Sequence, residues 1–287
     1  MSLLDRQIEK DLTDLYYGRE MSGAISLRSL GIVKGTDFST RGLPLHFAGN
    51  RNADTVFVML NPKENNFLAD SMFNAKTCAY NRHSVFDFID SYKRDKEKVT
   101  LPRLAQINPF DIKQAAFLGS WTDSGISFPL DFPDKQYTHW DAIENVLNQK
   151  LQLELIPYCS DTFGSIKKKD YMHLIPFLEN IFDEIVSVDR KYVIFGSSLF
   201  YDLFDYYTEY SKKAGTSNGV AFIRRRIKHV LKSKCVHYSA VKISYKEYEF
   251  SALIAHSFAD RAYNKATSLM VQYGEFCYEK YNMWLLP

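Results

Sequence analysis

Short segments of strand character that stop at turn-forming residues constrain the fold of this chain more than any other feature. The first segment, residues 55–60, is a continuous apolar run that ends at Asn-Pro. The second covers residues 151–156 and ends at a proline, and the third covers residues 192–195 and ends at Gly-Ser-Ser. A continuous apolar run of this length is typical of a strand that is buried on both faces, as in a parallel sheet.

A helix is expected between the second and third segments, because apolar residues between positions 171 and 186 recur at helical spacing. The order strand, helix, strand favours a parallel sheet. We therefore expect an α/β fold with three layers, in which helices flank a mainly parallel central sheet. The other expected elements are helices at residues 5–18, 199–210, 221–231 and about 260–281, and a hairpin or decorated edge strand formed by the runs 235–243 and 247–254.

The length of 287 residues fits one α/β domain that carries insertions. No linker separates two halves, so we expect a single domain over residues 1–287. Within it, residues 1–50 form an N-terminal helix and loop extension, and residues 51–287 form the core. Aromatic residues make up 15% of the chain, which supports a large core and leaves aromatic side chains for a binding surface.

The four cysteines are scattered without a close pair, so the sequence predicts neither a disulfide framework nor a CxxC metal site. The simplest inference is a reducing compartment. Charges interrupt the apolar positions near the start of the chain, and no later stretch approaches the ~18 apolar residues of a membrane span. We therefore expect an intracellular, cytoplasmic protein without a membrane partner.

Polar and aromatic residues follow each predicted strand. Ligands of an open parallel sheet bind beyond the carboxyl ends of its strands, so these residues form the candidate substrate site. Strand ends in any α/β protein also gather turn formers, and a purely structural role for these residues stays open. The candidates are Asn61, Pro62 and Phe67 after the first strand, Tyr158, Ser160 and Asp161 after the second, Ser197 after the third, and His256 and Ser257 after the last.

Basic residues are concentrated in one part of the chain, although the net charge is only +2. Residues 212–246 contain ten Lys and Arg residues and no Asp or Glu. Such a stretch can neutralise several phosphates of a nucleic acid. A solvated surface balanced by acidic residues from elsewhere is the other interpretation. The expected phosphate contacts are Arg224, Arg225, Arg226 and Lys228.

Other site classes have no support in the sequence. The seven histidines show no HxH, HxxxH or HExxH spacing, so no metal is expected. The Gly-Ser-Ser turn is not the GxSxG elbow of hydrolases, and no Walker or GxGxxG loop is present. We expect no cofactor.

The order of the strand-end motifs resembles that of the uracil-DNA glycosylase superfamily. Residues 59–62, Met-Leu-Asn-Pro, are similar to the GxNPG or GQDPY loop that ends the family's first strand. Residues 256–258, His-Ser-Phe, are similar to its late HPS-like segment, and residues 192–197 to its middle strand and glycine turn. The resemblance covers roughly residues 54–276 and implies a uracil-DNA glycosylase-like fold.

The resemblance also implies an activity, that of a DNA N-glycosylase. Such a hydrolase of DNA repair flips a base out of the nucleic acid and cleaves its N-glycosidic bond. By the resemblance Asn61 would position the attacking water, and His256 and Ser257 would face the flipped nucleotide and its phosphate. Phe67 or Phe73 would stack on the base.

The departures from the family motifs point away from uracil as the base. The glycine that precedes Asn-Pro in the first motif is missing here, and Ser257 stands where the late motif has proline. Pro157 and Tyr158 occupy the place of the amide that reads uracil. The resemblance therefore favours a modified or deaminated base other than uracil.

Two further functions stay open from the sequence. One is a nucleic-acid or nucleotide binding protein that keeps the fold without catalysis and uses the basic stretch. The other is a nucleotide-processing hydrolase of flavodoxin-like build. Nucleic acid or a nucleotide is the expected partner both of the glycosylase and of the binding protein.

Overall fold

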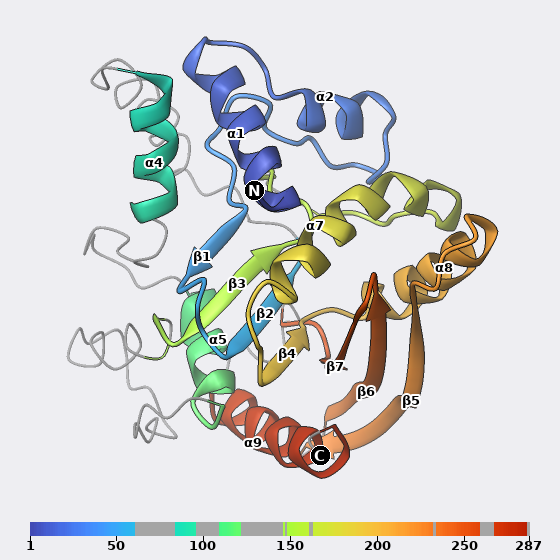
Figure 1. Cartoon of the computed structure of the whole chain (residues 1–287). Helices are drawn as coiled ribbons and strands as arrows, with labels where there is room; N and C mark the ends of the chain where they lie inside the picture. Colours follow the sequence, from blue (N-terminus) through green and yellow to red (C-terminus); the bar gives the residue numbers. More distant parts are fainter. Residues whose placement is uncertain are drawn as a thin grey trace. The chain divides into compact units, whose positions relative to one another are not determined.

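The structure is a computed structural model of the chain (Figure 1). It describes residues 1–60, 84–95, 109–121, 146, 148–160, 163–231, 234–258 and 267–285. The site residues Asn61, Pro62, Phe67, Phe73 and Asp161 lie outside the described residues.

Seven described strands form one sheet in the order β1-β3-β2-β4-β7-β6-β5. At the centre β2 pairs with β4, and β4 pairs with β7, both in parallel. The pairs β7–β6 and β6–β5 are antiparallel. The strands are β1 (Phe47–Gly49), β2 (Thr55–Met59), β3 (Lys150–Glu154), β4 (Tyr192–Phe195), β5 (Gly219–Leu231), β6 (Lys234–Tyr245) and β7 (Tyr248–Ile254). The protein is therefore α/β, with a mixed sheet whose core is partly parallel.

The three strands expected from the first, second and third segments are confirmed as β2, β3 and β4. Every residue of these strands is buried, as is typical of parallel strands that are covered on both faces. The expected hairpin is also confirmed, since β6 and β7 pair from Ser239 with Ile254 to Tyr245 with Tyr248.

The expected helix at residues 221–231 is wrong, because these residues belong to β5. The pairing of β5 with β6 explains the error. Phe222 pairs with Val241, but Arg224 pairs with Ala240, and Ile227 with Tyr238. Strand β5 thus has one extra residue at each of two bulges, which disrupt the alternation by which a strand is recognised.

Helices account for most of the remaining described chain. The leading helix is confirmed, and the Oγ of Ser2 accepts a hydrogen bond of 3.0 Å from the backbone N of Asp5 at its start. The helix expected between β3 and β4 is a 3₁₀ segment followed by an α-helix. The described α-helices are α1 (Leu3–Tyr16), α2 (Ser22–Ser29), α4 (Val85–Asp95), α5 (Pro109–Leu118), α7 (Ile175–Ile185), α8 (Leu199–Lys213) and α9 (Thr267–Trp284), and the 3₁₀ segment is η2 (Lys168–Leu174). None of the helices in this described set is long and apolar enough to cross a membrane.

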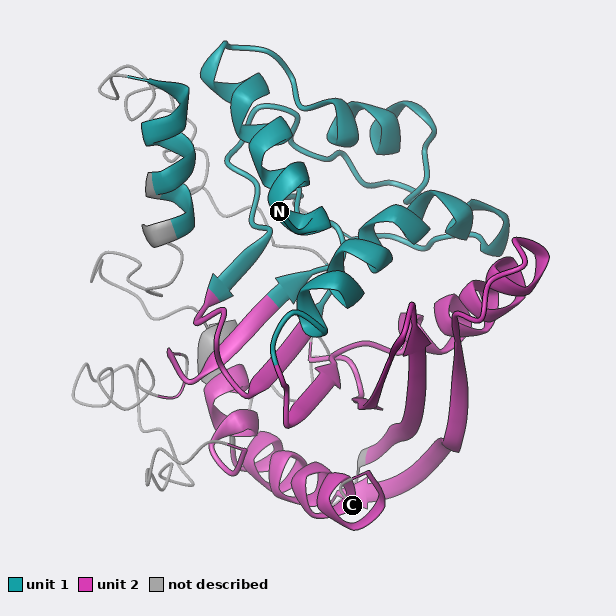
Figure 2. Ribbon diagram, in the orientation of Figure 1, with its two compact units in different colours: residues 1–48, 59–96, 153–188 teal, residues 49–58, 97–152, 189–287 magenta. Residues whose placement is uncertain are grey.

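The chain divides by its internal contacts into two compact units that are interleaved in sequence (Figure 2). Unit 1 comprises residues 1–48, 59–96 and 153–188, and unit 2 comprises residues 49–58, 97–152 and 189–287. Because both units take segments from several parts of the sequence, no single cut in the chain separates them. The single domain expected from the sequence stays a prediction.

Each unit has a buried apolar core. In unit 1, α1 packs on α4 and α7 and buries Leu4, Ile8 and Leu12. In unit 2, α5 packs on α9, and the rings of Phe57 and Phe117 lie 4.8 and 4.7 Å from that of Phe258. The high aromatic content of the sequence is therefore used in part for packing.

Candidate functional site

Two of the predicted site residues leave neighbouring parallel strands in unit 2. Phe195 of β4 is in register with Ile254 of β7, and the backbone N of Ala255 donates a hydrogen bond of 2.8 Å to the carbonyl of Phe195. If the pairing is extended by two residues beyond the strands, Ser197 is opposite His256. The structure thus brings the Gly-Ser-Ser turn and the His-Ser-Phe segment to the same end of the sheet.

Ser197 is buried and serves the start of α8. Its Oγ accepts a hydrogen bond of 3.3 Å from the backbone N of Leu199, and its carbonyl accepts one of 3.4 Å from the N of Phe200. These bonds use backbone donors that a helix start otherwise leaves without partners. Ser197 therefore has a structural role in addition to its position at the candidate site.

A buried tyrosine of α9 holds the end of β7 against β6. The hydroxyl of Tyr273 accepts a hydrogen bond of 2.6 Å from the backbone N of His256 and donates one of 2.9 Å to the carbonyl of His237. The two imidazole rings have centroids 6.2 Å apart and an interplanar angle of 29°. Tyr273 thereby fixes two histidines side by side, an arrangement that was not predicted from the sequence.

Lys228 extends the pair of histidines into a row across three strands. Lys228 of β5 is paired with His237 of β6, and β6 in turn pairs with β7, which ends just before His256. Residues directly opposite in an antiparallel pair project to the same face. We call Lys228, His237 and His256 the basic row.

The surroundings of His237 in the basic row disfavour its protonated form. Partial burial lowers the pKa of His237, and the nearby His256 lowers it further. Lys228 and Arg226 act on this pKa in the same direction. The Nδ1 of His237 has no hydrogen-bond partner among the described residues. A bound phosphate would reduce the repulsion between these groups.

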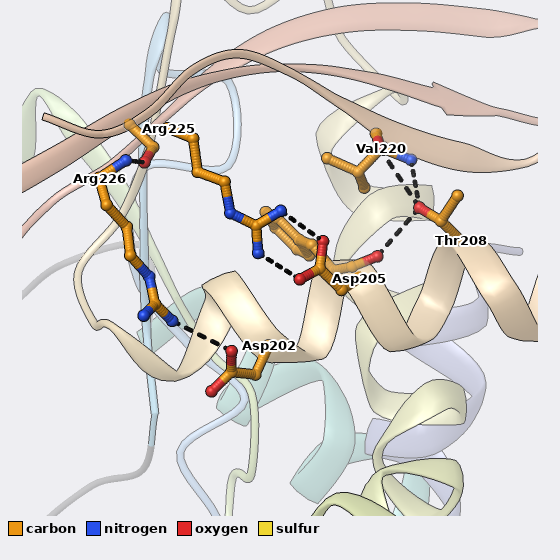
Figure 3. A network of polar contacts seen from close by, with 8 residues as sticks. Asp202, Asp205, Thr208, Val220, Arg225 and Arg226 are labelled. Atoms are coloured by element: carbon orange, nitrogen blue, oxygen red, sulfur yellow. Dashed lines mark hydrogen bonds and ion pairs between the residues drawn. The ribbon is translucent and has the colours of Figure 1, made fainter.

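Two of the four predicted phosphate contacts are paired with acidic residues of α8 (Figure 3). Arg225 forms two hydrogen bonds with the carboxylate of Asp205, one of them 3.0 Å long. Arg226 donates one of 3.1 Å to Asp202. Part of the basic stretch is therefore balanced by acidic residues from another segment, which is the second interpretation left open by the sequence.

The other two predicted phosphate contacts differ from this pair. Arg224 lies with its guanidinium 5.8 Å from the centroid of the Trp284 ring of α9. Lys228 has no ion pair among the described residues, and its side chain is exposed. Lys228 is therefore available to a phosphate without displacement of a carboxylate.

The predicted residues after β3 belong to unit 1. Tyr158 is buried, and its hydroxyl donates a hydrogen bond of 3.1 Å to Asp11. Burial and then the charge of Asp11 raise the pKa of Tyr158 far above its usual value. Ser160 is also buried. Tyr158 therefore stays protonated and contributes to the core of unit 1.

A cavity of about 300 Å³ opens in unit 2 at the amino ends of β2 and β4. The residues predicted to form the site follow the opposite, carboxyl ends of these strands, so the cavity was not expected. The amide residues that precede β2 were the signal that could have located it. The cavity is lined by Asn50, Asn52, Ala53, Asp54, Thr55, Trp121, Asn148, Gln149, Lys191, Tyr192 and Tyr278.

The described residues contain no group of three or more His, Cys, Asp or Glu side chains that could hold a metal ion. No family model matches the sequence, no curated protein matches it, and no solved structure matches the chain.

Proposed function

We propose that this chain is a uracil-DNA glycosylase-like protein that binds nucleic acid or a nucleotide and cleaves the N-glycosidic bond of a modified or deaminated base. The proposal includes the three-layer, mainly parallel version of the α/β fold and a cytoplasmic location. The observation that carries it is the parallel pairing of β4 with β7, by which Ser197 and His256 follow neighbouring strands. The adjacency supports the expectation that the segments after these strands face one site.

The chemistry of the reaction fits the residues assigned to it. Cleavage of an N-glycosidic bond develops positive charge on the sugar, and the base leaves as an anion. In the proposal Asn61 orients water on the sugar side, and the imidazole of His256 stabilises the leaving base by hydrogen bonding. The basic row attracts the phosphates next to the flipped nucleotide.

Base release from defined oligonucleotides tests the proposal. Duplex and single strands that contain uracil, hypoxanthine, xanthine or an alkylated base are incubated with the purified protein, and the free base is quantified. We expect release from at least one substrate, and a loss of about 10²-fold or more in His256→Ala and in Asn61→Ala.

A second histidine of the same unit gives a matched control. His229 of β5 stacks on Phe276 of α9, with ring centroids 3.7 Å apart. His229→Ala should therefore keep the rate of the unmodified protein. Absence of release from every substrate, or equal rates in all variants, would contradict the catalytic proposal.

The basic stretch at residues 212–246, in which the side chain of Lys228 is exposed, also favours a second candidate, binding of nucleic acid without catalysis. In that case the affinity falls steeply as salt increases, because each neutralised phosphate releases counterions. Binding would survive His256→Ala and Asn61→Ala, and Lys228→Ala would weaken it for all sequences. An affinity that does not change with salt would count against this candidate.

A further inference from the structure

We infer that the surface formed by Arg225 and Arg226 of β5 and Asp202 and Asp205 of α8 binds nucleic-acid phosphates, which displace the two aspartates from the arginines. We call it the exchange surface. The inference rests on the proposed function, since it requires a nucleic-acid partner. It adds that the carboxylates hold the arginines in a conformation that suits a phosphate.

The backbone of β5 turns two successive arginines to the same helix. Neighbouring residues of a regular strand point to opposite faces. Between Arg224 and Ile227, however, β5 has an extra residue, and Arg226 has a φ of 44°. The backbone N of Arg226 donates a hydrogen bond of 2.6 Å to the Oγ of Ser239, which fixes this conformation. Both guanidinium groups consequently reach α8, as Figure 3 shows.

A conformation with positive φ is unfavourable for an arginine. The bulge at Arg226 is therefore a feature that the surrounding contacts must maintain. Its consequence is two adjacent guanidinium groups, and the groups that oppose them are carboxylates. A guanidinium presents the same pair of N–H donors to a carboxylate and to a phosphate. Asp205 thus occupies a position that a phosphate can take.

The ion pairs are exposed enough to exchange. The side chains of Arg225 and Asp205 are 46% and 38% exposed, and those of Arg226 and Asp202 are 51% and 56% exposed. Exposed ion pairs are screened by solvent and contribute little to stability. A polyanion that offers several phosphates at once can therefore compete with two single carboxylates.

The exchange surface adjoins the basic row. Arg226 and Lys228 both lower the pKa of His237, so the three groups lie close enough to interact electrostatically. A strand of nucleic acid with one phosphate at the basic row would have its next phosphates near Arg226. The exchange surface would in this way extend the contact along the backbone of the nucleic acid.

The ion pairs are not the only contact that attaches α8 to β5 in the described residues. The Oγ1 of Thr208 accepts a hydrogen bond of 2.9 Å from the backbone N of Val220 (Figure 3). The same hydroxyl is 3.0 Å from the carbonyl of Phe204, to which it donates. Removing the aspartate charges should therefore leave the fold intact, and this makes a gain in affinity measurable.

Titration of fluorescein-labelled DNA oligonucleotides, single-stranded and duplex, tests the inference. Asp202→Asn and Asp205→Asn should each bind the oligonucleotide about two- to five-fold more tightly at low salt, because the phosphate no longer has to displace a carboxylate. Circular dichroism of each variant confirms that the fold is retained.

A matched control separates exchange from a general change of charge. Glu209 is on the same helix, is 65% exposed and pairs with Lys212 at 3.1 Å. Glu209→Gln removes the same charge but frees neither arginine, so its affinity should stay near that of the unmodified protein. An equal gain in Glu209→Gln would overturn the inference.

A double variant gives a second, independent check. In an Arg225→Ala background, Asp205→Asn should give no gain, because the competing arginine is absent. If the gain persists there, or if the aspartate variants bind no more tightly while Lys228→Ala still weakens binding, the exchange surface is wrong and the proposed function stands. If the unmodified protein binds no oligonucleotide at low salt, the proposed function itself fails.

Discussion

Each unit contains a cluster of acidic side chains and their partners, but in very different surroundings. In unit 1 the carboxylate of Asp11 is fully buried, accepts hydrogen bonds from Gln7 and Tyr158, and lies 3.1 Å from Nε2 of His46. In unit 2 the carboxylate of Asp205 is 38% exposed and pairs with Arg225. The same functional group thus has several buried partners in one unit and one solvated partner in the other.

The burial of a polar contact decides whether it can be exchanged for a ligand. A buried carboxylate whose partners are removed is left without compensation for its lost hydration. A half-exposed carboxylate regains water as soon as its partner leaves. The cluster around Asp11 therefore specifies the packing of unit 1, whereas the pairs of α8 and β5 are available for binding.

The largest effect is expected from Asp11→Ala. It leaves the buried hydroxyl of Tyr158 and the amide of Gln7 without their acceptor, so the free energy of unfolding should fall by about 3 kcal/mol or more. Denaturant unfolding measures this. Asp205→Ala should cost less than about 1 kcal/mol in the same experiment. Equal losses would remove the distinction between the two clusters.

A substitution next to the Asp11 cluster tests how tightly it is packed. A Cβ added at Gly23 would lie 2.0 Å from the hydroxyl oxygen of Tyr158. Gly23→Ala should therefore lower the free energy of unfolding by about 1 to 3 kcal/mol, although alanine normally favours a helix. Combining it with Tyr158→Phe removes the closest atom, so the added cost of Gly23→Ala should be smaller there. An unchanged or increased stability would show that the hydroxyl is not held in place.

A smaller effect is expected where α8 meets β5. Thr208→Val removes the acceptor for the backbone N of Val220 and should cost about 1 kcal/mol. Asp205→Asn, one turn earlier on the same helix, should cost less than this. Thermal unfolding of both variants compares the two contacts directly. The reverse order would mean that the ion pair, and not Thr208, attaches the helix.

The smallest effect on stability is expected from the protonation of His237 as the pH is lowered. Partial burial and the nearby His256 hold the pKa of His237 below its usual value of about 6.5, so the unfolded chain takes up this proton at a higher pH than the folded chain. Its contribution to stability is therefore full above about pH 6.5 and decreases as the pH falls below that value. NMR titration of the imidazole should give a pKa below the usual value, and added oligonucleotide should raise it. A pKa that does not respond to the oligonucleotide would place the phosphates elsewhere.

The sequence predicted the central strands well, because burial on both faces leaves a strong pattern. Residues 55–60 and 192–195 are almost wholly apolar, and each run stops within one residue of the end of its strand. The pairing of β6 with β7 was also accessible, since two apolar runs are separated by only a short turn. In contrast, β5 was mistaken for a helix, because its two bulges disrupt the alternation of side chains.

The candidate site was accessible only in part. The position of His256 after the last strand was visible in the sequence, and the parallel pairing of β4 and β7 supports its use. His237 was missed, since its neighbour across the sheet depends on the register of two strands and on the hydrogen bonds of Tyr273. The pairing of Arg225 and Arg226 with α8 was missed for a similar reason, because a one-residue bulge decides which face an arginine occupies.

The irregular shape of β5 also bears on how copies of this protein meet one another. Strand β5 has thirteen residues and stands at the end of the described sheet order. A long, flat terminal strand offers its backbone groups to a strand of another molecule and promotes aggregation, whereas bulges and basic side chains oppose such pairing. The bulge that turns Arg225 and Arg226 toward α8 therefore also makes β5 a poor template for pairing with a strand of another copy.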